Sequence, residues 1–265
     1  PSTPDTRLAR VAALLARAGR AFPGKAALVF YDLEGGRGVY YQQDLQLESA
    51  SLVKLPLLVE LYRRQAREGL DLDRELVFDE RFRVAGSGIL QHEAAGSRWK
   101  LRHLARLMIA ESDNVASDML LEFLGPRQVE AAMARLGLKK TTVRRRIFDF
   151  EARAAGRDNL TSARDMLILL RSLARGELPG SAEMLDILKA TRRRDMLPAG
   201  LPAGTPVAHK TGELDGVLHD AGIVWSPRGA YVLIMLGQDF PDRQRALQSW
   251  VDLSRRVWQA WSPGA

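Results

Sequence analysis

The segment SLVK, Ser51 to Lys54, holds a serine and a lysine whose spacing could activate a nucleophile. Three positions apart on a helix, the two side chains share one face, so the amine can reach the hydroxyl. Apolar neighbours would favour the neutral amine, which can accept the serine proton. Taken alone, the spacing favours a plainer interpretation, a helix-capping serine and a lysine whose stem packs. The same spacing occurs at Ser97 and Lys100 in a polar turn.

A second motif, SDN, covers Ser112 to Asn114 between two helical segments. Its serine hydroxyl could relay a proton to a leaving group, and the Asn114 amide could hold a substrate carbonyl. Helix capping, for which Ser, Asp and Asn are the preferred residues, explains the motif equally well. The motif alone does not decide between them.

A third motif, HKTG, covers His209 to Gly212 on a predicted strand. Lys210 supplies a positive charge and Thr211 a hydroxyl, while Gly212 lets a ligand approach the backbone. On an edge strand this combination could bind an extended, peptide-like ligand. A bulge near the strand end is the alternative.

Together the three motifs have the order and placement of a known signature. SLVK at a helix start, SDN in a helix-to-helix loop and KTG on a strand resemble the class A β-lactamases and penicillin-binding proteins. The segments GSGILQHEAAGSRWKLRHLARLMIAESDNVASDMLLEFLG and GRDNLTSARDMLILL also resemble helical segments of these serine hydrolases. The resemblance covers nearly the whole chain and implies an acyl-serine mechanism on β-lactams or related amides and esters.

The resemblance also implies a role for each motif residue. Ser51 would be the acylated nucleophile, Lys54 its base and Ser112 the proton relay. The backbone N–H groups of Ser51 and Glu213 would form the oxyanion hole. The substrate-binding residues would be Asn114, Lys210, Thr211, Gly212 and Glu213.

One expected feature is missing from the loop VRRRIFDFEARAAGRDNLTS. In the efficient β-lactamases of this family, a glutamate followed four positions later by asparagine places the deacylating water. Here Glu151 is followed at that distance by Ala155, and the only nearby asparagine is Asn159. Glu151 is the candidate base and Asp149 the alternative, while a solvated loop residue is the other interpretation of Glu151. We therefore expect weak β-lactam turnover and a long-lived acyl-enzyme.

The segment after KTG lacks the arginine that usually supports the substrate carboxylate in class A enzymes. No arginine occurs from Asp195 through Pro227, whereas Glu213, Asp215 and Asp220 lie close to KTG. Carboxylates that face the cleft would repel an anionic group and favour neutral or cationic amides and esters. In HDAG, His219 is expected to be a structural histidine paired with Asp220.

Three functions remain open from the sequence. The chain is a β-lactamase-type hydrolase with slow turnover, an esterase or D-amino-acid peptidase on the same scaffold, or a penicillin-binding acceptor that stays acylated and acts as a sensor. The missing arginine favours the second function, and the missing Glu/Asn pair favours the third.

Composition limits the partners. The 265 residues include no cysteine, which excludes disulfides and thiol catalysis. The formal charge is +7, but the basic clusters Arg144–Arg146 and Arg192–Arg194 lack interleaved aromatics, so no nucleic-acid partner is expected. HEAAG at His92 has Gly96 where a second zinc ligand would have to be, and neither metal nor cofactor is implied. We expect a monomer with a small-molecule substrate and no membrane span, periplasmic or secreted if an export signal was removed before Pro1.

The remaining pattern predicts the elements that position these motifs. KAALVFYDLEGGRGVYYQQDLQ alternates around Gly35 and Gly36, which predicts a β-hairpin after an opening helix. Helical periodicity dominates residues 51–191, three strands follow within residues 205–239, and the amphipathic helix RQRALQSWVDLSRRVWQAW comes last. We predict an α+β, β-lactamase/transpeptidase-like fold with an antiparallel sheet from both termini flanked by helices. Residues 1–265 would form a single catalytic domain, with an α/β lobe at 1–50 and 192–265 and an inserted helical lobe at 51–191.

Overall fold

A five-stranded antiparallel sheet lies at the centre of the computed structural model, which describes residues 4–262. From edge to edge the strands are β2 (Arg37–Tyr41), β1 (Lys25–Asp32), β9 (Gly229–Gln238), β8 (Val217–Ser226) and β7 (Val207–Leu214). The sheet joins strands from both ends of the chain, so the predicted fold class is confirmed. The predicted hairpin between β1 and β2 is confirmed as well, with Gly36 in the left-handed region at φ +67°.

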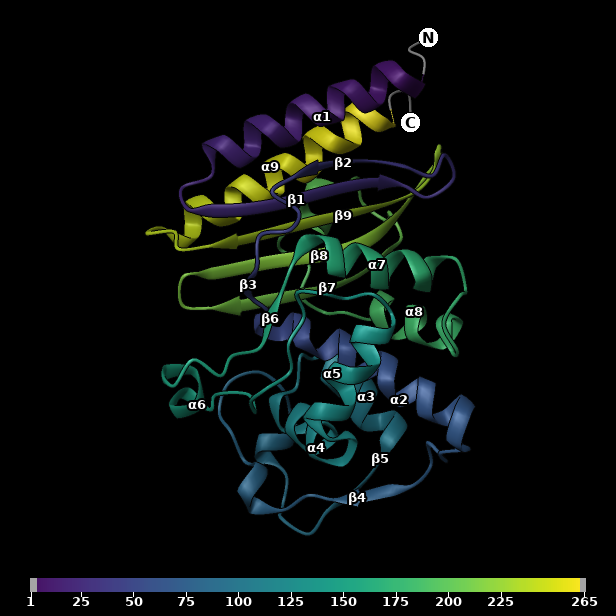
Figure 1. Ribbon diagram of the computed structural model, residues 1–265, viewed down its shortest axis with the longest axis vertical. Helices are drawn as coiled ribbons and strands as arrows, with labels where there is room; N and C mark the ends of the chain where they lie inside the picture. The colour runs from purple at the N-terminus through teal and green to yellow at the C-terminus, as the bar shows by residue number, and fades with distance from the viewer. Residues whose placement is uncertain (1–3, 263–265) are drawn as a thin grey trace.

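Helices cover both faces of this sheet (Figure 1). α1 (Pro4–Ala21) and α9 (Arg243–Trp261) pack side by side on one face, while α7 (Ala163–Ala174) and α8 (Ser181–Lys189) contact the other. Under α9, the Trp250 ring stacks on Phe22 with 4.3 Å between the ring centroids. Gly237 of β9 makes room for this pair, since a Cβ there would lie 2.5 Å from the Phe22 ring.

Burial on both faces explains why β1 is apolar without alternation. Leu28 and Phe30 belong to the core under α1 and α9, whereas Val29 and Tyr31 belong to the core on the opposite face. Successive side chains of a strand point to opposite faces, so a strand covered on both sides needs apolar residues at every position.

The helical part of the chain lies beyond α7 and α8, on the side of the sheet away from α1 (Figure 1). Its helices are α2 (Lys54–Glu68), α3 (Leu101–Ala110), α4 (Asn114–Leu124), α5 (Pro126–Arg135) and α6 (Phe150–Ala154). Two short strand pairs, which the sequence pattern did not predict, are β3 (Leu47–Glu48) with β6 (Leu160–Thr161) and β4 (Glu75–Val77) with β5 (Arg98–Lys100). Residues 4–262 also contain four 3-10 turns, η1 (Ala50–Val53), η2 (Glu80–Phe82), η3 (Leu90–His92) and η4 (Pro198–Gly200).

The division of the chain into two lobes stays a prediction. α8, which the sequence assigns to the helical lobe, contacts both strand β7 and helix α3. Residues 1–3 and 263–265, which the predicted α/β lobe includes, lie outside the described part of the chain. Between residues 4 and 262, no helix combines the length and the apolar character needed to cross a bilayer.

Candidate active site

Ser51 lies in the 3-10 turn η1, which leads directly into α2. Pro56, in the first turn of α2, has no N–H to donate, and the turn before α2 has 3-10 geometry. Ala50 has φ +44°, a left-handed backbone that is strained for a residue with a Cβ. Edge strand β7 runs beside this turn, and a Cβ on Gly212 would lie 3.3 Å from the backbone N of Ser51. The absence of a side chain at Gly212 therefore lets β7 lie against the backbone of Ser51.

Lys54 is completely buried, and residues of the SDN motif surround its amine. Its Nζ donates hydrogen bonds to Ser112 O at 2.6 Å, to Ser112 Oγ at 3.1 Å and to Asn114 Oδ1 at 2.9 Å. Burial lowers the pKa of Lys54 well below its ordinary value, and the charge of Lys210 lowers it further. The environment therefore favours the neutral amine that proton abstraction requires.

Lys210 approaches the same hydroxyl from β7. Its Nζ lies 3.0 Å from Ser112 Oγ and donates to Thr211 O at 2.9 Å. Burial lowers the pKa of Lys210 to about 7, although the carboxylate of Asp220 opposes the shift. The Ser112 hydroxyl thus lies between two amines, one from α2 and one from β7.

A buried carboxylate holds the turn that presents Ser112. Ser112 has φ +54°, and the next residue, Asp113, caps the first turn of α4. The second oxygen of Asp113 accepts hydrogen bonds from the N–H groups of Ile89 and Leu90. A Cβ on Gly88 would lie 2.3 Å from the Asp113 carboxylate, so this segment packs closely against the SDN turn.

Two hollows adjoin Ser51, and both are also lined by Ser87 and Glu213. The first, of about 270 Å³, is further lined by Ile109, Ala110, Glu111, Ser112, Thr191, Arg192, Arg193, Lys210 and Thr211. The second, of about 190 Å³, is further lined by Ala50, Asn114, Arg145, Ile147, Phe148, Asn159 and Leu214. The fold therefore gathers the predicted residues of all three motifs around Ser51.

Sequence reasoning missed Ser87. Its Oγ donates to Ser112 O at 2.8 Å, next to the amine of Lys54. In the sequence it is marked only by its position between Gly86 and Gly88. Because Gly88 packs against Asp113, the preceding Ser87 lies next to the SDN turn as well.

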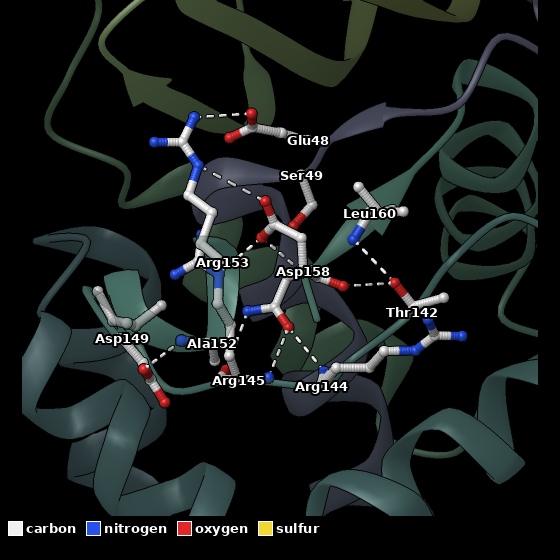
Figure 2. Close-up of polar contacts among 12 residues, drawn as sticks. Glu48, Ser49, Thr142, Arg144, Arg145, Asp149, Ala152, Arg153, Asp158 and Leu160 are labelled. Carbon is white, nitrogen blue, oxygen red and sulfur yellow. Dashed lines mark hydrogen bonds and ion pairs between the residues drawn. The ribbon is translucent and has the colours of Figure 1, made fainter. Parts of the chain in front are cut away.

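The loop before β6 is folded back on itself by ion pairs. Arg145 and Asp158 close its base with 2.6 Å between Nε and Oδ1 (Figure 2). Figure 2 also shows Arg153 reaching both Glu48, at 2.7 Å, and Asp158, at 3.6 Å. These ion pairs tie the loop to its own base and to Glu48 of β3.

Glu151 is the one predicted site residue that the fold places elsewhere. It lies on the short helix α6 with an exposed side chain and lines neither hollow. The alternative base, Asp149, is exposed and accepts from the Ala152 N–H as the cap of α6 (Figure 2). Ile147 and Phe148 line the second hollow in their place.

Ile147 is held at the hollow by a buried aspartate of α4. Asp118 Oδ1 accepts from the Ile147 N–H at 2.8 Å, and Asp118 is buried. Burial raises the pKa of Asp118 to about 6, and the hydrogen bond from Ile147 only partly offsets the shift. The charged carboxylate is therefore less stable here than in water.

Asp118→Asn keeps the acceptor oxygen and removes the charge, so its effect on stability should depend on pH. A raised folded-state pKa means that the folded chain binds more protons than the unfolded chain between about pH 4 and 6, so wild-type stability falls as pH rises through that window. The advantage of Asp118→Asn over wild type should grow by roughly 2 kcal/mol from pH 4 to pH 7. Urea unfolding at pH 4 and pH 7 measures the free energy of unfolding of each variant, with Asp186→Asn, at an exposed position, as control. If Asp118→Asn and wild type differ in this free energy by the same amount at both pH values, the raised pKa of Asp118 is contradicted.

Two arginines that the sequence did not assign flank Glu213. Arg193 precedes the arginine-free segment by two positions, and Arg243 comes from the first turn of α9. Arg193 Nη1 lies 2.5 Å from Glu213 Oε2, and Arg243 Nε lies 2.5 Å from Glu213 Oε1. Only the folded chain brings these groups together, 20 and 30 positions away along the sequence. Two guanidinium groups therefore hold the carboxylate of Glu213 in the lining of both hollows.

The predicted pairing of His219 with Asp220 is wrong. Asp220 instead lies 2.9 Å from Nδ1 of His209 on the neighbouring strand. His219 Nε2 donates to Glu48 O at 2.7 Å, and its Nδ1 accepts from the Gly237 N–H at 3.1 Å. Burial lowers the pKa of His219 to about 4, so it is a neutral, structural histidine. Adjacent residues of a strand point to opposite faces, which excludes the predicted contact.

Among residues 4–262, no three His, Asp or Glu side chains cluster closely enough to hold a metal ion.

Residues 7–261 match the sequence profile of the beta-lactamase enzyme family. A beta-lactamase of Streptomyces albus G is 27% identical over 232 residues, which cover 83% of this chain and 74% of the relative. Among solved structures, PBP-A has a TM-score of 0.85 at 30% identity, with 95% of each chain covered. A beta-lactamase of Sphaerobacter thermophilus DSM 20745 also reaches 0.85, at 26% identity over 95% of this chain and 97% of that one.

Proposed function

Because this chain belongs to the beta-lactamase enzyme family, we propose that β-lactams acylate it at Ser51 and that the acyl group is then cleared slowly. The chain is a β-lactamase-like serine hydrolase, and the proposal concerns its residues and its turnover. The observation that carries the proposal is the lining of the second hollow. Its only carboxylate within the described residues is Glu213, which two arginines already bind.

Acylation follows from the groups around Ser51. Neutral Lys54 takes the Ser51 proton while Oγ attacks the carbonyl carbon, and the C–O bond forms. Backbone N–H groups of Ser51 and Glu213 stabilise the oxyanion. When the C–N bond breaks, the leaving nitrogen takes the proton of the Ser112 hydroxyl, which the amines of Lys54 and Lys210 can replace. The side-chain amide of Asn114 donates a hydrogen bond to a carbonyl of the substrate.

Deacylation needs a water that loses a proton as it attacks the acyl ester. Ile147 and Phe148 offer no acceptor for that proton, and Glu151 is turned to solvent. A positioned base typically contributes about a hundred- to ten-thousand-fold in rate, so its absence leaves the ester long-lived. One solved relative, a PBP-A variant at 29% identity, is described as an acyl-enzyme complex with penicillin G, which supports a stable ester on this fold.

The test is an intact-mass time course with penicillin G and a cephalosporin, with an assay of the drug remaining. A stoichiometric adduct that persists while excess drug remains is the expected result. An adduct that vanishes as many equivalents of drug are consumed would establish a fast β-lactamase and contradict slow clearance. No adduct with either drug, together with cleavage of simple esters, would favour the esterase or D-amino-acid peptidase instead.

Ile147→Glu should shorten the lifetime of the adduct, because it adds a proton acceptor where the hollow has none. Asp118 already fixes the backbone at this position, so the new side chain starts from the lining of the hollow. We expect deacylation to accelerate by about tenfold, less than an optimised base provides. The decay of the adduct mass after removal of free penicillin measures it. Ile147→Gln has the same shape without the base, and an equal acceleration in that variant would rule out general-base catalysis.

A further inference from the structure

Glu213 occupies the position where strand β7 passes Ser51. Its side chain is about one quarter exposed and lines both hollows. Arg243 grips the carboxylate with two nitrogens, Nε at 2.5 Å from Oε1 and Nη2 at 3.2 Å from Oε2. Arg193 adds a third contact at 2.5 Å. Hydrogen bonds from Arg243 and Arg193 outweigh burial and hold the pKa of Glu213 below its ordinary value, so it is charged at neutral pH.

The other arginine of the first hollow is paired as well. Arg192 lies 2.7 Å from Glu111, and Arg193 also binds Asp195 at 2.9 Å. Each arginine that lines the first hollow therefore already contacts a carboxylate of the protein. In the first hollow, an anionic ligand therefore meets only guanidinium groups that already pair with a carboxylate of the protein.

A carboxylate gripped by two guanidinium groups is also the arrangement by which proteins bind carboxylate ligands. An anionic substrate has to displace Glu213 from Arg193 and Arg243, or lie beside a charge of its own sign. An uncharged substrate meets neither penalty, because the ion pairs can stay in place. The contacts of Glu213 therefore disfavour negatively charged substrates, while an uncharged substrate can still enter the hollows.

We propose that Glu213 takes the place of a substrate carboxylate, so that the site selects amides and esters that are uncharged beside the scissile bond. The proposal rests on acylation at Ser51 and adds the class of substrate. Glu213 acts here as a specificity-determining residue, through Arg193 and Arg243, in addition to its backbone N–H.

Benzylpenicillin and its methyl ester test this, because they differ only in the charge of one carboxylate. The measured quantity is the ratio of their second-order acylation rate constants, acid over ester, obtained from intact mass. Glu213→Gln should raise this ratio about tenfold over wild type, equivalent to about 1.4 kcal/mol in favour of the anion. Asp215→Asn is the matched control, since Asp215 is exposed, lies two residues away and lines neither hollow. Its ratio should equal that of wild type.

A second variant tests the role of the arginines. In Glu213→Gln combined with Arg243→Gln, the gain for the acid should disappear, because the guanidinium released by the first change is gone. An unchanged ratio in Glu213→Gln, or an equal rise in Asp215→Asn, overturns the inference while ester labelling leaves the proposed function intact. Absence of labelling by both compounds overturns the proposed function and this inference with it.

Discussion

Ser51→Ala is expected to abolish covalent labelling by penicillin completely and to leave the fold intact. The hydroxyl is the atom that forms the ester, whereas the turn around Ser51 is held by backbone contacts with β7. Ser51 is only half-buried and lines both hollows, so removing its hydroxyl does not open a cavity in the core. Intact mass after incubation with penicillin G measures the loss, and a thermal melt checks the fold.

The chain supplies its own control for this change. Ser97 lies three positions before Lys100, the same spacing, but it comes directly before strand β5 and lines neither hollow at Ser51. Its hydroxyl accepts from the Trp99 indole at 2.9 Å, which is a structural role. Ser97→Ala should label like wild type. Labelling that survives in Ser51→Ala would remove the central assignment of the site.

Lys54→Met should slow acylation by about a hundred- to ten-thousand-fold, the usual contribution of a positioned base. Methionine keeps much of the packing volume of this buried side chain but cannot take a proton. Thermal stability should change little, because the lost hydrogen bonds are offset by removal of a buried amine whose charged form is disfavoured. The observed rate of adduct formation at several penicillin concentrations separates binding from the chemical step.

Lys100→Met is the matched control for Lys54→Met. Lys100 is 43% exposed and pairs with Asp73 at 3.3 Å on the surface, so its removal should leave acylation unchanged. If Lys54→Met acylates at the wild-type rate, another group takes the Ser51 proton, and Lys210 is the amine that already contacts the relay hydroxyl.

The sequence predicted the elements whose pattern extends over many residues. α9 begins and ends where its amphipathic pattern does, at Arg243 and Trp261, and the three C-terminal strands all lie within residues 205–239, as predicted. The short pairs β3–β6 and β4–β5 were not predicted, because two or three residues are too few to show a period.

The sequence predicted those site residues that belong to the SLVK, SDN and HKTG motifs. Ser51, Lys54, Ser112 and Lys210 belong to three short segments. The fold brings the two lysine amines to the Ser112 hydroxyl, and Ser51 lines the same hollow as Ser112. Arg243 could not be assigned, since a surface arginine in a helix and a binding arginine look alike in sequence. A role for Glu151 as the base stays a prediction. Its side chain is exposed on α6, and the neighbouring Arg153 pairs with Glu48, 105 positions away, a contact that the local sequence does not indicate.

The central strand pair has a consequence for how this protein is made. Val29 of β1 lies opposite Ile234 of β9, 205 positions later in the chain. During synthesis the β1–β2 hairpin therefore leaves the ribosome long before its partner strand exists, with the apolar edge of β1 unpaired. Contacts of such long sequence separation close slowly, because the intervening loop must lose entropy first. The sheet can be completed only after β9 (Gly229–Gln238) has emerged, so the edge of β1 stays exposed to aggregation until synthesis is nearly finished.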